Sequence, residues 1–192
     1  MLNDVAINFL DELGITTKNE QPTLEILSNS NSKYLRDLKV NIKTALAAEE
    51  LGERDALLIA YTISVTLKNQ VLQESFRIKL VNIGASNDEI AEAASIASLL
   101  SANNVLYRFR HFSDNKKYVD LPARIRMNIM MSPVLGKELF ELLSLAVSSV
   151  NGCEVCVKSH EHSVRELNVS EERIFAAIRV AAVIASADRI VS

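Results

Sequence analysis

Apolar residues along most of the chain recur at spacings of three to five positions. Two segments show this most clearly, and their apolar positions are Leu35, Leu38, Ile42, Leu46 and Leu51 in one and Ile174, Ala177, Ile178, Ala181 and Ile184 in the other. This spacing places the apolar side chains along one stripe of an α-helix. We find no segment that alternates apolar and polar residues as a half-buried strand does. The pattern predicts an all-α fold of about ten helices with short connections.

Local signals mark where several helices begin. Ser86 and Ser170 each precede acidic residues and a long apolar-periodic run. A serine at this position accepts a hydrogen bond from the first turn, and acidic residues there oppose the helix dipole. A further helix is expected from Gly136 to Val150. Asn151 is then the expected N-cap of the following helix, which would place Cys153 in that helix's first turn.

The chain resembles itself at a fixed offset. A shift of 84 positions aligns Gly52 with Gly136 and Ser86 with Ser170, and it also aligns Ile90 with Ile174. Such an offset is typical of a tandem duplication of a helical unit. We predict one domain over 1–192, with a degenerate first repeat over 33–113 and a second repeat over 121–192. Chance matching of small and apolar residues in an alanine-rich helical chain is the alternative.

Composition narrows the class of protein. Apolar residues make up 48% and charged residues 23% of 192 residues, which is typical of a folded globular domain. The net charge of −3 argues against a nucleic-acid binder held by bulk electrostatics. No uncharged apolar run approaches the roughly 20 residues that cross a bilayer. The first fifteen residues are acidic and predict an amphipathic helix, not a signal peptide. We therefore expect a cytoplasmic protein without membrane partners.

The chemistry of the chain is concentrated in the segment NGCEVCVKSHEH. It contains the only two cysteines, Cys153 and Cys156, with His160 four residues after the second. On a helix these three positions lie within about 60° of one another, whereas His162 falls on the opposite side and is expected to be solvated or at an interface. A histidine can take the proton of one thiol, and a second thiol can capture the oxidised sulfur as a disulfide. The helix start favours a thiolate at Cys153.

The two cysteines also allow two other interpretations. A structural zinc site needs four ligands, usually in pairs from separate elements. Only three candidates share a face here, and the chain has no second C-x-x-C or H-x3-H motif. Inert buried thiols are the other alternative. A redox function is favoured over both, with no bound metal or cofactor.

Glu141 is a carboxylate within an apolar stretch from Phe140 to Val147. It lies either on the solvent stripe of its helix or in the interior with a partner. The imidazole of His160 would be that partner, which would give a Glu–His–Cys relay of the kind that tunes thiols. The residues alone do not decide between these two positions.

The spacing of Glu141, Cys153, Cys156 and His160, E-x11-C-x-x-C-x3-H, resembles that of the AhpD-like alkylhydroperoxidases of the carboxymuconolactone decarboxylase superfamily. The stretches 103–110 and 126–129 are similar to that family as well. The resemblance implies a helical fold of two tandem repeats. It also implies that Cys156 is the peroxidatic thiolate and that Cys153 resolves the sulfenic acid and is attacked by the external reductant. His160 would be the base for Cys156, and Glu141 would orient His160 or relay protons.

The resemblance also implies partners. These are an organic hydroperoxide or a protein disulfide as substrate, an external lipoyl or thioredoxin-like dithiol reductant, and a peroxiredoxin or lipoyl-bearing protein. The family is commonly a trimer or a larger homo-oligomer such as a hexamer. Basic and aromatic residues interleave over 107–112, where we expect a structural or subunit-interface role and no nucleic-acid contact.

One residue departs from the pattern. Val155 stands where alkylhydroperoxidases of the AhpD type have a histidine before the second cysteine. This predicts weaker hydroperoxide turnover with disulfide reductase activity retained. It also motivates an alternative from another class, a redox-sensing protein whose disulfide controls the oligomeric state without efficient turnover.

Overall fold

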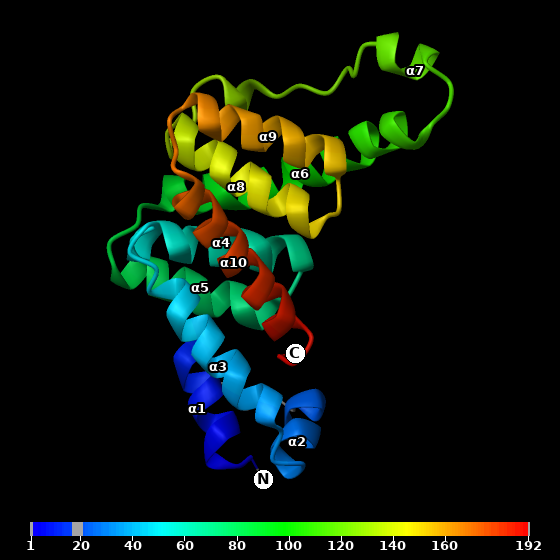
Figure 1. The fold of residues 1–192 in the computed structure, drawn as a ribbon. Helices are drawn as coiled ribbons and strands as arrows, with labels where there is room; N and C mark the ends of the chain where they lie inside the picture. The colour runs from blue at the N-terminus through cyan, green and yellow to red at the C-terminus, as the bar shows by residue number, and fades with distance from the viewer. Residues whose placement is uncertain (1, 17–20, 192) are drawn as a thin grey trace.

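The computed structural model describes residues 2–16 and 21–191, and these ranges contain ten α-helices, one short 3-10 helix and no strand (Figure 1). The prediction of an all-α fold is therefore confirmed. The elements are α1 (Asp4–Leu13), α2 (Pro22–Asn29), α3 (Lys33–Leu46), α4 (Glu53–Leu67), α5 (Gln70–Asn82), α6 (Asn87–Phe112), α7 (Lys117–Asp120), η1 (Asn128–Met130), α8 (Lys137–Val150), α9 (Glu154–Glu166) and α10 (Glu171–Asp188).

The predicted helix starts at the two serines are confirmed. The Ser86 hydroxyl accepts a hydrogen bond from the backbone of Glu89, whose carboxylate accepts one from the backbone of Ser86. This reciprocal pair satisfies two of the unpaired N–H groups at the start of α6. The Ser170 hydroxyl accepts from the backbone of Arg173 at 3.2 Å in the same way at the start of α10.

The 84-residue offset relates the bounds of three helices to those of three others. The starts of α5 and α9 are 84 residues apart, and so are their ends. The starts of α4 and α8 are also 84 residues apart, as are the starts of α6 and α10. The two N-cap glycines also match, with φ of 73° and ψ of 157° at Gly52 and 79° and 157° at Gly136. A positive φ of this kind favours glycine at both positions. These coincident bounds support the predicted duplication.

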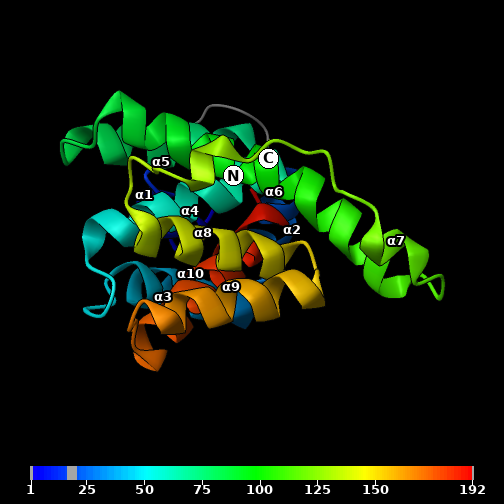
Figure 2. The same cartoon turned by 90° about the horizontal axis from the view of Figure 1, so that it is seen from above.

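The offset divides these helices into a first unit, α4–α6, and a second unit, α8–α10, and the long third helix of each unit, α6 or α10, packs on both units. The first unit's α6 contacts its own α4 and also α8 and α9 of the second unit, and α10 contacts α8 and also α4. Figure 2 shows α6, α8 and α9 side by side. The central segments 56–64 of α4 and 142–148 of α8 are buried throughout. The α8–α9 pair, which carries the cysteines, is therefore covered by a helix from the other half of the chain.

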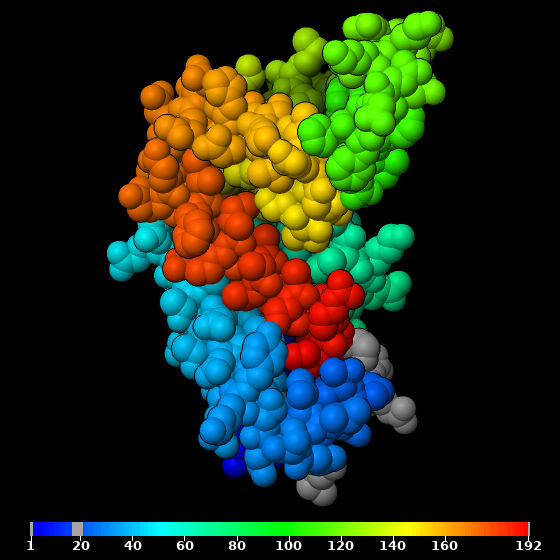
Figure 3. Space-filling view, turned by 45° about the vertical axis from the view of Figure 1, so that its right-hand side comes forward, coloured from blue at the N-terminus to red at the C-terminus, as the bar shows by residue number. Residues whose placement is uncertain are grey.

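The N-terminal helices lie at one end of the molecule. Figure 1 shows α1 and α2 below the two units, where α1 packs against α3. Figure 3 shows α3 and α10 next to each other on the surface, and the end of α6 with α7 projecting beside the start of α9. Within the described ranges, no helix is long and apolar enough to cross a membrane.

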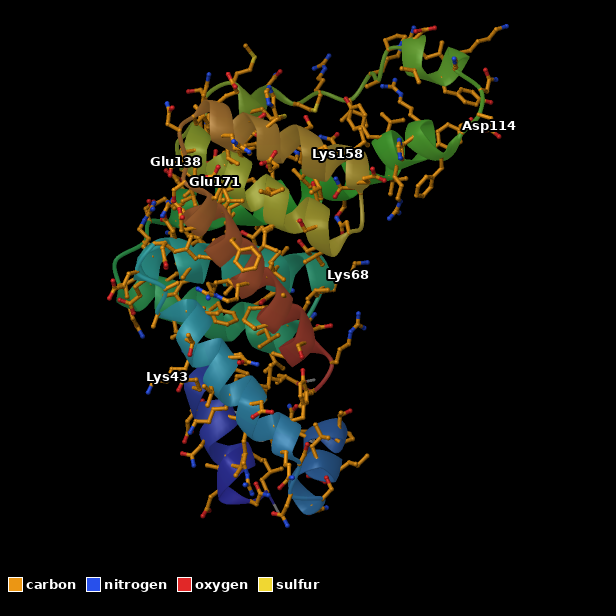
Figure 4. All side chains as sticks on the ribbon, viewed as in Figure 1. Lys43, Lys68, Asp114, Glu138, Lys158 and Glu171 are labelled. Carbon is orange, nitrogen blue, oxygen red and sulfur yellow. A yellow bond between two sulfur atoms is a disulfide. The ribbon has the colours of Figure 1, made fainter. Side chains whose placement is uncertain are left out.

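A charged network joins the two units where α4, α8 and α10 begin. The Arg173 guanidinium contacts Asp55 at 2.6 Å and Glu138, labelled in Figure 4, at 3.0 Å, and it donates to the Glu50 carbonyl at 2.7 Å. The corresponding positions of the first unit carry an ion pair of reversed charge, Arg54 with Glu89. Because the Arg173 side chain is only 20% exposed, these contacts are partly shielded from water. They fix the start of α10 against both α4 and α8.

A long connection leads from α6 to α8 by way of α7 and η1, and it passes over α9 in Figure 1. The buried Glu92 of α6 fixes the end of this connection. Its carboxylate accepts hydrogen bonds from the backbone N–H groups of Val134 at 2.8 Å and Leu135 at 2.6 Å. Two such bonds compensate the cost of removing the carboxylate from water. The preceding residues are thereby held over the cysteine region.

Replacement of Glu89 by alanine tests the start of α6. Bonds from the Ser86 backbone and the Arg54 side chain hold the pKa of the Glu89 carboxyl below its usual value. Because the pKa of this carboxyl is lower in the folded than in the unfolded protein, its ionisation contributes to the free energy of unfolding. This contribution is fully present above about pH 4.3 and is lost as the pH falls through the folded-state pKa. Glu89→Ala should lower the free energy of unfolding by about 1 kcal/mol at pH 7 and by less at pH 3. Urea unfolding at both pH values measures this.

The matched control is Glu74→Ala, which removes a carboxylate paired with Arg77 on the exposed surface of α5. Its effect on unfolding should be clearly smaller, because exposed ion pairs contribute little. Equal losses of unfolding free energy in the two variants, or a loss in Glu89→Ala that does not change with pH, would contradict the stabilising role of the Glu89 carboxylate at the start of α6.

Candidate active site

The two cysteines stand at the junction of α8 and α9. They are joined as a disulfide, with their Cα atoms 5.3 Å apart. After α8 ends at Val150, the chain turns through Asn151 and Gly152, and Gly152 has a φ of +66° that favours glycine. The backbone N–H of Cys153 donates back to the Ser148 carbonyl of α8 at 3.1 Å. The resulting turn is short and brings the Cys153 backbone against the end of α8.

The prediction for the start of α9 was wrong. Asn151 is the C-cap of α8, not the N-cap of α9, and Cys153 itself is the N-cap, with φ −96° and ψ 90°. The reason is that the side chain of Asn151 bonds to Asn104 on α6 and that Gly152 extends the turn by one residue. Cys153 therefore precedes the helix, and only Cys156 and His160 share a face of α9.

The two sulfurs have different access to solvent. Cys153 has no exposed surface, whereas Cys156 is 6% exposed and lines a hollow of about 300 Å³. A molecule that enters this hollow reaches Cys156 first. The difference between the cysteines fits a reactive Cys156 and a Cys153 that reacts only with its neighbour. The resemblance implies attack of the external reductant on Cys153, and this step is not tested by the structure, although Cys156 is the more accessible of the two cysteines.

The walls of the Cys156 hollow come from three separate parts of the chain: α6, the connection around η1, and α9. Its lining residues are Leu100, Asn103, Tyr107, Met127, Met130, Val155, Cys156, Ser159 and His160. Most of these side chains are apolar, which suits the organic part of a small substrate. Sequence reasoning did not assign the α6 and η1 residues to the site. The available signal was that the stretches 103–110 and 126–129 resemble the same family as the cysteine motif.

Glu141 and His160 form the polar part of the site. The Glu141 carboxylate, on α8, lies 2.6 Å from Nδ1 of His160, and the two side chains are 17% and 12% exposed. The sequence left open whether Glu141 reaches this imidazole, and the structure places them in contact. Because a carboxylate can only accept, Nδ1 carries the proton in this bond. In the neutral ring Nε2 then keeps a lone pair that can accept a proton.

The two sides of this pair border different hollows. His160 lines the Cys156 hollow, and Glu141 lines a second one of about 310 Å³ that also contains Lys137 and His162. His162 is exposed, as predicted. Met130 of η1 borders both hollows. The imidazole and the carboxylate of the pair therefore line different hollows that share one methionine.

Side chains of the basic and aromatic stretch 107–112 make contacts within the chain. Arg108 donates to the Asn151 carbonyl at 2.7 Å, and Arg110 donates to the Leu121 carbonyl. The rings of Phe109 and Tyr118 are 5.1 Å apart. These contacts agree with a structural role, one of the two roles predicted for the stretch, and leave the subunit-interface role a prediction.

Two further observations concern other parts of the molecule. Among the residues that the structure describes, no group of three or more His, Cys, Asp or Glu side chains could hold a metal ion. A hollow of about 600 Å³ lies far from the cysteines and includes Lys43 and Lys79. The Lys79 ammonium donates to the Glu12 carbonyl at 2.7 Å, near the end of α1. This lysine therefore has a structural partner, since cations favour helix C-termini.

The chain is similar to known proteins over most of its length. The model of the carboxymuconolactone decarboxylase family matches residues 117–192, which include both cysteines. A protein of Solibacter usitatus named alkyl hydroperoxide reductase AhpD is 42% identical over 161 residues, 84% of this chain and 90% of the relative. Proteins of the same name are 38% identical in Methylobacterium sp. strain 4-46 (85% and 93% covered) and 34% identical in Rhodopseudomonas palustris strain BisA53 (85% and 90% covered).

Proposed function

Because this chain belongs to the AhpD-like group of the carboxymuconolactone decarboxylase family, we propose that it reduces organic hydroperoxides and protein disulfides through the Cys153–Cys156 pair. It is an enzyme of the alkyl hydroperoxide reductase type. The observation that carries the detailed proposal is the position of Cys156. This sulfur lines an apolar hollow together with His160, which is hydrogen-bonded to Glu141 at 2.6 Å.

In the first step the Cys156 thiolate attacks the terminal oxygen of the hydroperoxide. The O–O bond breaks, Cys156 becomes a sulfenic acid, and the organic oxygen leaves as an alkoxide. His160 takes the thiol proton beforehand and returns it to the alkoxide, which becomes an alcohol. Glu141 holds the imidazole in the tautomer that leaves Nε2 free to accept that proton, and it stabilises the imidazolium.

In the second step the Cys153 sulfur attacks Cys156. The S–O bond of the sulfenic acid breaks, a disulfide forms, and the oxygen leaves as water after taking the proton of the Cys153 thiol. Cys153 suits this role because it is buried and three residues from Cys156. Its position at the start of α9 stabilises the thiolate that attacks.

The cycle closes with an external dithiol, for which a lipoyl-bearing or thioredoxin-like protein is the proposed donor. One thiol of the donor attacks Cys156, the more accessible of the two cysteines, and Cys153 leaves as a thiolate and takes up a proton. The second thiol of the donor then attacks the mixed disulfide and releases the Cys156 thiol. The donor ends as a disulfide. This cycling requires the reducing cytosol, which is the proposed compartment.

The proposed assembly is a homo-oligomer, a trimer or a hexamer, and a peroxiredoxin is a proposed partner. The support for self-association is the projecting end of α6 with α7 (Figure 3), which presents Phe109, Phe112, Val119 and Leu121 with more than half of each side chain exposed. Apolar surface of this kind typically marks an interface.

Serine substitutions of the two cysteines test the proposed function. Cys156→Ser should abolish consumption of cumene hydroperoxide with dihydrolipoamide as reductant, because no thiol then lines the hollow. Cys153→Ser should form the Cys156 sulfenic acid once and then stop cycling through an internal disulfide. Steady-state peroxide consumption and trapping of the sulfenic acid with dimedone measure these outcomes. Circular dichroism checks that both variants keep the fold.

Full activity of Cys156→Ser would overturn the assignment of the thiol. A wild-type protein that reacts with one equivalent of hydroperoxide and then stops, although dihydrolipoamide has reduced its disulfide, would favour a redox sensor. The sensor predicts a single reaction per protein, whereas an enzyme predicts many.

Val155→His tests the proposed weakness of the hydroperoxide step. Val155 borders the Cys156 hollow and is 36% exposed, so a histidine there would add a second base beside the thiol. We expect kcat/KM for cumene hydroperoxide to rise at least about tenfold. Reduction of insulin disulfides should change by less than about twofold, since that step needs no such base.

Val155→Asn adds polarity without a titratable group and is the control. An unchanged kcat/KM, or an equal gain in Val155→Asn, would contradict the account.

A further inference from the structure

We propose that Asn104 and Arg108 of α6 are positioning residues that hold the Cys153 turn, so that the Cys153 thiol stays within reach of Cys156 when the pair is reduced. The effect of this positioning on catalysis rests on the proposed function. The positioning itself requires only that the Cys153–Cys156 disulfide can be reduced and formed again.

The buried side chain of Asn104 joins α6 to the end of α8. Asn104 is 1% exposed, and both ends of its amide are used. Its Nδ2 donates to the Ser148 hydroxyl at 3.0 Å, and its Oδ1 accepts from Nδ2 of Asn151 at 2.8 Å. One turn further along α6, Arg108 donates to the Asn151 carbonyl at 2.7 Å. We call these three bonds the turn clamp.

The turn clamp is connected directly to the backbone of Cys153. Ser148, whose hydroxyl bonds to Asn104, also accepts the Cys153 N–H at its carbonyl, at 3.1 Å. Asn151 is two residues before Cys153, and only Gly152 separates them. Glycine restricts the backbone less than any other residue. Contacts from outside the turn are therefore needed to fix the direction in which the Cys153 side chain points.

None of the clamp atoms belongs to a cysteine, so the clamp can persist when the disulfide opens. The equilibrium between a dithiol and its disulfide depends on how closely the fold holds the two sulfurs in the reduced state. A reduced protein with a fixed turn loses little freedom when the S–S bond forms. Without the clamp, the same bond has to order the turn as well, and the disulfide becomes easier to reduce.

The turn clamp also affects whether the Cys156 sulfenic acid reacts next with Cys153 or with a second hydroperoxide. Attack by Cys153 on the Cys156 sulfenic acid gives the disulfide and water. If that attack is slow, a second hydroperoxide oxidises the sulfenic acid to a sulfinic acid and is itself reduced to an alcohol. A misplaced Cys153 should therefore increase sulfinic acid at Cys156, without slowing the first attack on the hydroperoxide.

The first unit contains a corresponding contact without thiols. The offset of 84 pairs Asn104 with Asp188 and Cys153 with Asn69. Asp188 of α10 accepts a hydrogen bond from Nδ2 of Asn69 at 3.1 Å, at the start of α5. A contact between a long helix and the turn of the other unit is thus part of the fold in both halves. Only in the second unit does it lie next to redox chemistry, so the first unit provides the matched control.

The test compares Asn104→Leu with Asp188→Leu. For each variant, the equilibrium of the Cys153–Cys156 pair with reduced and oxidised glutathione is measured by alkylation and mass spectrometry. Asn104→Leu should lower the equilibrium constant for disulfide formation about tenfold, which corresponds to a reduction potential about 30 mV less negative. Asp188→Leu should leave it within about twofold of wild type, although both variants are expected to lose stability.

A second readout separates positioning from general loosening of the fold. Under cumene hydroperoxide, Asn104→Leu should accumulate Cys156 sulfinic acid several-fold faster than wild type, and Asp188→Leu should not. In a Cys153→Ser background, where no resolution occurs, Asn104→Leu should form the sulfenic acid at the wild-type rate. A changed rate there would show that Asn104 acts on the first step and would overturn its assignment to positioning.

If Asn104→Leu does not fold, Asn151→Ala removes one bond of the clamp at a half-buried position and should shift the glutathione equilibrium in the same direction. Equal shifts in the Asn104 and Asp188 variants, or no shift in either clamp variant, would overturn the proposal. The glutathione equilibrium involves no peroxide. A wild-type protein without hydroperoxide turnover would therefore refute the proposed function while the clamp is still tested.

Discussion

The packing of α8 against α9 is the constraint on which the rest of the site depends. At one end the short turn through Asn151 and Gly152 brings Cys153 back onto the Ser148 carbonyl. Further along, the same pair of helices places the Glu141 carboxylate 2.6 Å from the His160 imidazole. A shift of α9 by one residue along α8 would separate Cys153 from the Ser148 carbonyl and Glu141 from His160. The register of two helices therefore sets the position of both thiols and of the group that can take a proton.

The duplicated pattern shows how side chains decide which half of the fold has chemistry. At the positions of α5 that correspond to Cys156 and His160 on α9, the first unit has Leu72 and Phe76, both without exposed surface. These two apolar side chains belong to the core of the protein. In α9 the corresponding residues border a hollow of about 300 Å³. The same helix bounds thus support a packed core in one half and a cysteine that borders a hollow in the other.

Much of this arrangement follows from local patterns in the sequence. Apolar periodicity predicts the helices, and Ser86 and Ser170 predict two of their starts, because capping depends only on neighbouring residues. The start of α9 was predicted two residues too early, since the Asn151 side chain bonds to Asn104, which is 47 positions away. For the same reason the residues alone left two positions open for Glu141, one of them the contact with His160, and gave no indication of the Met127 and Met130 walls. They depend on how distant segments pack.

We propose that Cys156 is the thiol that attacks the hydroperoxide and that Cys153 is the thiol that resolves the sulfenic acid. The most direct test is a single turnover of the reduced wild-type protein with one equivalent of cumene hydroperoxide, followed by product analysis and peptide mapping. We predict one equivalent of alcohol per chain and an intramolecular Cys153–Cys156 disulfide, formed through a sulfenic acid that dimedone traps at Cys156. Alcohol formation without this disulfide, or dimedone trapped at Cys153, would contradict the claim.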